Sequence, residues 1–280
     1  MNTHSESRRR FLRQSSVAGL LGLLPAFSSQ AQGRKISRIG LQLYSLRNEM
    51  ASDFEGTLRK LAELGYKEMQ FAGYHGKSPE YVKKLLDQLG LTSPAAHVSL
   101  NLVRNELDKQ IDIAKEIGQR YIVVPSIPSD ERTLDHYQLH AETLNEAGER
   151  RRKEGLDIAY HNHSFEFELQ SSMTGYDHLL ASTDPSLVSF ELDLYWAVNA
   201  GADPITLFKK HPGRFPLVHV KDQNASGEMV DVGKGVINFS EIFKHSDTAG
   251  IRHYFVEHDY PDDGINSIAD SYNALSNINF

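Results

Sequence analysis

The chain has 280 residues, of which 40% are hydrophobic and 24% are charged, so it can bury a sizeable core and is not disordered by composition. It contains no cysteine, which excludes disulfides, thiolate metal sites and cysteine nucleophiles. The 37 acidic residues outnumber the 30 basic ones and leave a formal net charge of −7, so we expect no nucleic-acid partner.

The first 31 residues have the three-part layout of a signal peptide. The basic stretch Arg8-Arg9-Arg10 precedes an apolar run over residues 16–24, and small residues follow up to Ala31. The apolar run is about half the roughly 20 residues that a bilayer span needs, so we predict cleavage near Ala31 and no stable membrane anchor. The paired arginines indicate the Tat translocon. We therefore expect a Tat-exported periplasmic protein whose folded domain covers residues 32–280.

Short apolar runs rich in β-branched residues follow one another along residues 34–280, each bounded by turn residues. Their length and composition are typical of buried strands. Eight strands are predicted, at Ile39 to Tyr44, Glu68 to Ala72, Ser93 to Val98, Tyr121 to Pro125, Leu156 to His161, Val188 to Asp193, Pro216 to Val220 and Tyr254 to His258.

Amphipathic stretches lie between these runs. Apolar residues recur three or four positions apart over residues 54–64, 81–89 and 111–117, a spacing typical of helices. Four glycines stand just before a predicted strand, where a left-handed residue ends a helix; they are Gly65, Gly90, Gly118 and Gly155.

The eight strand and helix units predict one α/β domain with the (β/α)8 TIM barrel fold. A doubly wound open sheet would give a similar alternation. The segment Gly73-Tyr74-His75-Gly76 does not have the spacing of a dinucleotide-binding or phosphate-binding loop, which favours the barrel.

Polar residues close the last four predicted strands, at the barrel end where reactive groups lie. Burying such groups without compensation costs several kcal/mol each, and a cation would compensate. Imidazoles and carboxylates without sulfur predict one divalent metal ion, of Mn, Zn, Co, Fe or Mg; the alternative is a set of hydrogen-bonded residues without metal. Strand alternation places four pairs on one face, assigned here to the barrel interior: His161 with His163, Glu191 with Asp193, His219 with Lys221, and Glu257 with Asp259.

These motifs resemble the sugar phosphate isomerase/epimerase family of xylose-isomerase-like TIM barrels. The resemblance covers nearly all of the chain after the predicted signal peptide. It is carried by Gly40-Leu41-Gln42-Leu43-Tyr44-Ser45-Leu46-Arg47, Phe71-Ala72-Gly73-Tyr74, Tyr160-His161-Asn162-His163-x-x-Glu166-Phe167, Glu191-Leu192-Asp193-x-Tyr195-Trp196, His219-Val220-Lys221-Asp222 and Glu257-x-Asp259.

The resemblance implies one metal ion held by residues of strands five to eight. Asp193, His219 and Glu257 match three ligand positions, and His161 stands where relatives carry a glutamate, with His163 and Glu166 as competing choices.

The resemblance also implies a carboxylate at the end of strand two. This chain has Gln70 there, which counts against a mechanism with two carboxylates.

The activity that the resemblance implies is isomerisation or epimerisation of a small-molecule sugar. A base would remove a proton next to a carbonyl, and the metal would stabilise the enediolate. One alternative is a lyase or hydratase that eliminates a group from a 3-keto sugar or 3-keto glycoside. Another is a non-catalytic periplasmic sugar-binding barrel. A DNA-repair endonuclease, from the same superfamily, is disfavoured by the acidic charge.

Three residues are predicted to take part in the chemistry. His163 and Glu166 lie beside the predicted metal and are candidates for base and acid, although Glu166 could instead orient a histidine. Lys221 is a candidate to stabilise the oxyanion; the alternative is an ion pair with Glu191 or Asp259.

Three further residues are predicted to bind the substrate. Gln42 and His97 close strands one and three and are candidates to contact hydroxyl groups. Trp196, the only tryptophan, is a candidate to stack on a sugar face, with ordinary packing as the alternative. The oligomeric state is not readable from the sequence.

Overall fold

The computed structural model describes residues 33–151 and 154–280. The predicted signal peptide lies outside these residues, so export and cleavage near Ala31 stay predictions. Within the described ranges, no helix is long and apolar enough to cross a membrane.

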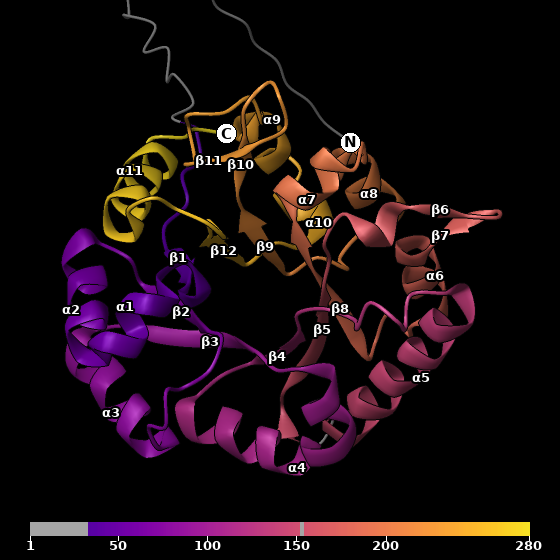
Figure 1. The fold of residues 1–280 in the computed structure, drawn as a ribbon, viewed down its shortest axis with the longest axis horizontal. Coiled ribbons are helices and arrows are strands. Elements are labelled where there is room, and N and C mark those ends of the chain that lie inside the picture. The colour runs from indigo at the N-terminus through magenta and orange to yellow at the C-terminus, as the bar shows by residue number, and fades with distance from the viewer. Residues whose placement is uncertain (1–32, 152–153) are drawn as a thin grey trace, which may run out of the picture. The chain divides into compact units, whose positions relative to one another are not determined.

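Eight parallel strands close into a barrel, and helices form a ring around them (Figure 1). The order around the barrel is β1-β12-β9-β8-β5-β4-β3-β2, so the (β/α)8 TIM barrel prediction is confirmed. The strands are β1 Ile39–Gln42, β2 Glu68–Phe71, β3 Thr92–His97, β4 Tyr121–Val124, β5 Asp157–His161, β8 Val188–Asp193, β9 Leu217–Val220 and β12 His253–Val256.

All eight predicted strands are present, but β1 and β12 each end two residues earlier than predicted. β1 ends at Gln42 because the chain turns into a 3-10 helix over Leu43–Leu46. The Gln42 side chain caps this helix by accepting a hydrogen bond from the Tyr44 backbone N–H. β12 ends at Val256, so Glu257 and Asp259 lie on the loop that follows it.

Helix ends follow the local signals in the sequence. Asp53 caps α2 by accepting a hydrogen bond from the Gly56 backbone N–H, and the helix ends at Gly65 with φ of 110°. The helices are α1 Arg47–Ser52, α2 Phe54–Leu64, α3 Pro79–Leu89, α4 Leu100–Ile117, α5 Leu134–Arg151, α6 Gly175–Ser182, α7 Leu194–Asn199, α8 Pro204–Lys210, α9 Phe239–Phe243, α10 Ser246–Ala249 and α11 Gly264–Ser276.

Two short hairpins, which the sequence analysis did not predict, sit on loops outside the barrel. They are β6 Leu169–Gln170 with β7 Met173–Thr174, and β10 Asp222–Gln223 with β11 Met229–Val230.

The barrel interior changes from apolar to polar along its axis. Residues two positions apart on a strand share a face, so Ala159 and Leu217 lie below His161 and His219. A layer of apolar side chains therefore supports the polar groups from beneath. This apolar layer consists of Ala95, Tyr121, Val123, Ala159, Leu217 and Phe255.

Candidate metal centre and active site

Four ligand-type side chains meet at the C-terminal ends of β5, β8, β9 and β12. His161, Asp193, His219 and Glu257 are buried, and one possible ligand atom from each lies within 4.8 Å of the others. The sequence placed these four residues on one interior face, and the structure brings them together.

Imidazole nitrogens and carboxylate oxygens face one another at short distances within this cluster. Nδ1 of His219 lies 2.7 Å from Oε2 of Glu257 and 3.6 Å from Oδ2 of Asp193, yet it has no hydrogen-bond partner among the described residues. Nε2 of His161 lies 3.3 Å from the same Asp193 oxygen. Two imidazole nitrogens facing two carboxylate oxygens make a donor set that first-row divalent metals accept. The cluster is therefore a candidate metal-binding group.

Asp193 is held in place by its second carboxylate oxygen. Oδ1 accepts a hydrogen bond of 2.9 Å from the Trp196 backbone N–H and caps α7, while the Asp193 backbone N–H donates to Asn162. This leaves Oδ2 to face the cluster.

Below the cluster, a hydrogen-bond network sets the tautomer of His219. The Gln70 amide nitrogen donates to Glu191 at 2.6 Å, so the Gln70 oxygen is the acceptor that lies 2.6 Å from Nε2 of His219. Nε2 therefore carries a proton, and Nδ1 is the nitrogen left to face the cluster as a possible metal ligand. The second Glu191 oxygen lies 2.7 Å from Nε2 of His97 and 3.2 Å from Nε2 of His219.

Lys221 lies above the cluster with its ammonium group among three carboxylates. Its Nζ is 3.0 Å from Asp193, 2.7 Å from Glu257 and 2.9 Å from Asp259. Burial alone would lower the pKa of Lys221, but these carboxylates raise it well above its usual value. Lys221 is therefore a cation at neutral pH, and of the two ion pairs considered as alternatives for it, the one with Asp259 is present.

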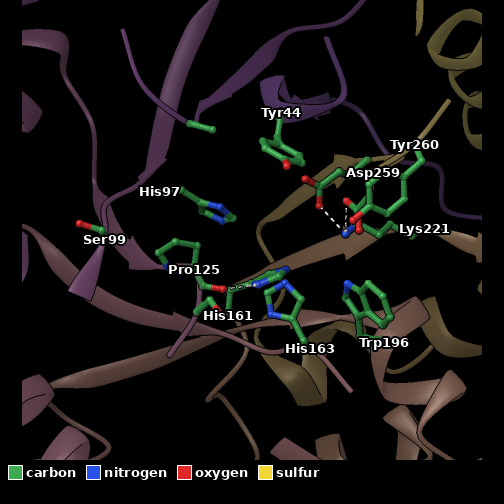
Figure 2. Close-up of a pocket in the computed structure, with 13 residues that line it drawn as sticks. Tyr44, His97, Ser99, Pro125, His161, His163, Trp196, Lys221, Asp259 and Tyr260 are labelled. Atoms are coloured by element: carbon green, nitrogen blue, oxygen red, sulfur yellow. Dashed lines mark hydrogen bonds and ion pairs between the residues drawn. The ribbon is translucent and has the colours of Figure 1, made fainter. Parts of the chain in front are cut away.

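A pocket of about 420 Å³ opens above the cluster (Figure 2). His97, His163 and Trp196 line it, as expected for residues that meet a substrate. His163 has no carboxylate within ion-pair distance among the described residues, unlike His97 and His161. Burial, together with the charges of His161 and Lys221, lowers the pKa of His163 to about 3.

Among the residues predicted to take part in the chemistry or to bind the substrate, Glu166 and Gln42 do not line this pocket. Glu166 points into the protein behind β5, where it accepts hydrogen bonds from the Tyr160 hydroxyl at 2.6 Å and the His163 backbone N–H at 2.7 Å. A direct catalytic role for Glu166 is therefore not supported, because the 3-10 turn over residues 165–167 directs it inward. Gln42 is fully buried and donates to Gln70 at 2.8 Å, so it belongs to the network below the cluster.

The structure adds pocket residues to which the sequence analysis gave no role. Asp259, Tyr44 and Tyr260 line the pocket beside Lys221. Burial and the neighbouring Glu257 raise the pKa of Asp259. Strand alternation and the Glu257-x-Asp259 motif pointed to Asp259, and Tyr44 lies in one of the motifs that carry the resemblance, but nothing in the sequence marked Tyr260.

The comparisons with known proteins agree with this geometry. Residues 58–278 match the model of the xylose isomerase-like TIM barrel family. The chain belongs to this family.

Three similar proteins illustrate the range of the family. An inosose dehydratase of Lacticaseibacillus casei is 27% identical over 236 residues, which are 70% of this chain and 78% of that protein. The crystal structure of a sugar phosphate isomerase/epimerase from Parabacteroides distasonis superposes with a TM-score of 0.75 at 30% identity, covering 90% of this chain and 96% of that one. A protein named IolI, solved with a bound zinc atom, shares only the fold, with a TM-score of 0.68 at 13% identity over 87% of this chain and 99% of that one.

The family and its enzymatic character are thus established, but an isomerase activity is not. Inosose dehydratases are lyases, so the curated relatives fit the alternative of elimination better than the main expectation of isomerisation.

For this member of the family, we predict that the purified protein holds about one divalent ion per chain. Asp193→Ala and His161→Ala should each remove the ion, because each deletes one candidate ligand. Elemental analysis of the parent and both variants measures this. A parent that carries no metal, and gains no thermal stability from any of the five candidate metals, would contradict the prediction.

A second prediction concerns the His219 tautomer. Glu191→Gln should lower metal affinity roughly 10- to 100-fold. A neutral amide at position 191 would hold the His219 ring less firmly, although all four candidate ligands remain. Glu68→Gln is the matched control, since Glu68 is also buried and lies 2.7 Å from a histidine, His253, but outside the site. Competition with a chelator gives both affinities, and equal affinities would refute the assigned role of Glu191.

A third prediction concerns pH. Burial raises the pKa of Glu166 from 4.5 to about 7, so the folded protein holds this proton more tightly than the unfolded chain. The stability that Glu166 contributes is therefore present below pH 4.5 and is lost as the pH rises through about 7. Relative to Glu166→Gln, the wild type should lose roughly 3 kcal/mol of unfolding free energy between pH 5 and 8.

Urea denaturation at several pH values measures this difference. Glu168→Gln is the control, because the side chain of Glu168 is exposed and lies only two residues further along the chain. A wild-type minus Glu166→Gln difference that stays constant with pH would show that Glu166 has no raised pKa.

Proposed function

We propose that the chain is a metal-dependent lyase that removes water, or another group on the β carbon, from a cyclic ketone of the sugar or cyclitol class. The observation that carries this proposal is the candidate metal-binding group beside a pocket that His163 also lines. The imidazole of His163 is uncharged, because its pKa is lowered to about 3, and it has no carboxylate within ion-pair distance among the described residues. The inosose dehydratases among the relatives support the same class of reaction.

The reaction begins with removal of a proton from the carbon next to the carbonyl. That carbon becomes acidic only when the charge that develops on the carbonyl oxygen is stabilised. His161, Asp193, His219 and Glu257 would hold a divalent ion, which when bound would supply Lewis acidity to that oxygen. Lys221 keeps its proton, so it serves as a cation beside the developing charge and not as a base.

His163 is the residue placed to carry the proton. Its imidazole accepts the proton from the α carbon, and the electrons of the broken C–H bond form the enolate. When the carbon–carbon double bond forms, the C–O bond at the β carbon breaks, and the imidazolium returns its proton to the departing oxygen. The products are an enone and water or an alcohol, and no oxidant or reductant is consumed.

Gln70 favours elimination over epimerisation. An epimerase that inverts a carbon removes the proton from one face and returns one to the other, which uses a group on each side of the substrate, and strand β2 offers only an amide at this position. The Gln70 amide is also fully occupied, with Glu191, His219 and Gln42 as partners. Elimination needs a single proton carrier, because the proton leaves with the departing oxygen.

We predict that the metal-loaded protein converts inosose or a 3-keto sugar to its dehydration product. His163→Ala should lower turnover by about 10²- to 10⁴-fold, the usual contribution of a general base, while metal content is unchanged. Proton NMR in deuterium oxide follows both loss of the α proton and formation of the enone.

Three other outcomes decide between the alternatives. Deuterium in the recovered ketone together with an isomeric sugar would favour an isomerase. Sugar binding without exchange or product would favour a non-catalytic binding barrel. Full turnover in His163→Ala would assign the base to another residue, with Asp259 the next candidate in the pocket.

A further inference from the structure

Two exposed tyrosines stand at the mouth of the pocket. Tyr44 is 41% exposed and Tyr260 is 73% exposed, and both line the pocket that holds the metal-binding group. Figure 2 shows them beside Asp259 along one edge, with His163 and Trp196 along the opposite edge. We call this pair the tyrosine rim.

The tyrosine rim is formed by neighbouring parts of the barrel. Tyr44 follows β1 and Tyr260 follows β12, and these two strands pair in parallel. The closure of the barrel therefore brings residues 44 and 260 together, although they lie at opposite ends of the folded domain's sequence.

Arg47 holds the tyrosine rim in place. Its guanidinium lies 4.6 Å from the ring centroid of Tyr44 and 5.9 Å from that of Tyr260, within the range of cation–π contacts. The same guanidinium donates hydrogen bonds to the backbone oxygens of Tyr44 at 3.1 Å and Asp259 at 2.9 Å. The two rings are thus positioned before any ligand arrives, which lowers the entropic cost of binding.

The position of the rim distinguishes it from ordinary surface residues. Three other large hydrophobic side chains are exposed among the described residues, Leu139, Leu169 and Val236, and none of them lines the pocket. Asp259 connects the rim to the chemistry, because its backbone oxygen binds Arg47 and its carboxylate binds Lys221. Asp259 thus links the tyrosine rim to Lys221, which contacts two of the candidate metal ligands.

We propose that the tyrosine rim is a subsite for a second ring of the substrate. The substrate class is then a keto sugar in glycosidic linkage to another sugar or to an aromatic group, rather than a free monocyclic ketone such as inosose. Aromatic side chains with a polar hydroxyl are suited to this, since they offer an apolar face and a hydrogen-bonding edge to one ligand. This inference rests on the proposed lyase function.

The test compares two substrates that differ only at the second ring. The probes are methyl and phenyl 3-keto-β-D-glucoside, given to the metal-loaded full-length protein. The readout is the ratio of kcat/KM for the phenyl over the methyl compound. Comparing this ratio between variants cancels the intrinsic reactivity of each leaving group.

The ratio should fall roughly three- to tenfold in Tyr260→Ala and in Tyr44→Ala, which matches the usual strength of an aromatic contact. It should be kept in Tyr260→Phe, which retains the ring. Leu169→Ala is the matched control, since it removes an exposed apolar side chain outside the pocket and should leave the ratio unchanged.

The outcomes separate this inference from the proposed function. Dehydration of inosose with no turnover of either glucoside, or a ratio that is the same in wild type and both alanine variants, would overturn the subsite and leave the lyase function standing. No reaction with any ketone would overturn both. A ratio that falls in the alanine variants alone supports both.

Discussion

The balance of buried charge around Lys221 is the interaction on which the site depends. An unpaired ion in a protein interior costs several kcal/mol, and removing one partner of a buried pair is strongly destabilising. Here the carboxylates of Asp193, Glu257 and Asp259 share one ammonium group that is almost completely buried. The carboxylates can therefore stand close enough to hold a metal because a permanent cation stands beside them. β8, β9 and β12 are consecutive in the barrel, which is what places these groups together.

His219 connects this charged layer to the hydrophobic core. Its Nε2 is bound from below by Gln70 and Glu191, and its Nδ1 faces Asp193 and Glu257 above. The Phe255 ring packs edge-on beneath it at a centroid distance of 6.4 Å. The His219 imidazole thus contacts the core, the hydrogen-bond network and the candidate metal ligands. A substitution that moves the core side chains beneath it would therefore also move a candidate metal ligand.

The family accommodates isomerases and dehydratases because the two reactions share their first step. Both remove a proton next to a carbonyl and need a stabilised enolate oxygen. They differ in what the enolate does next, and that choice depends on which groups can return a proton and where. The proposed loss of a β substituent in this chain rests on the amide at the end of β2 and on the imidazole after β5 that has no ion-pair partner among the described residues.

The sequence by itself predicted the eight strands and the glycines that end α2, α3 and α4, because strand periodicity and residue type are local properties. It also predicted a set of candidate ligands, with the strand-five position left open among His161, His163 and Glu166. It did not determine that Glu166 points away from the pocket, since a turn of three residues decides that direction. Nor did it reveal the tyrosine rim, because Tyr44 and Tyr260 become neighbours only when β1 pairs with β12 and closes the barrel. Contacts between distant segments depend on that closure, and no local pattern encodes it.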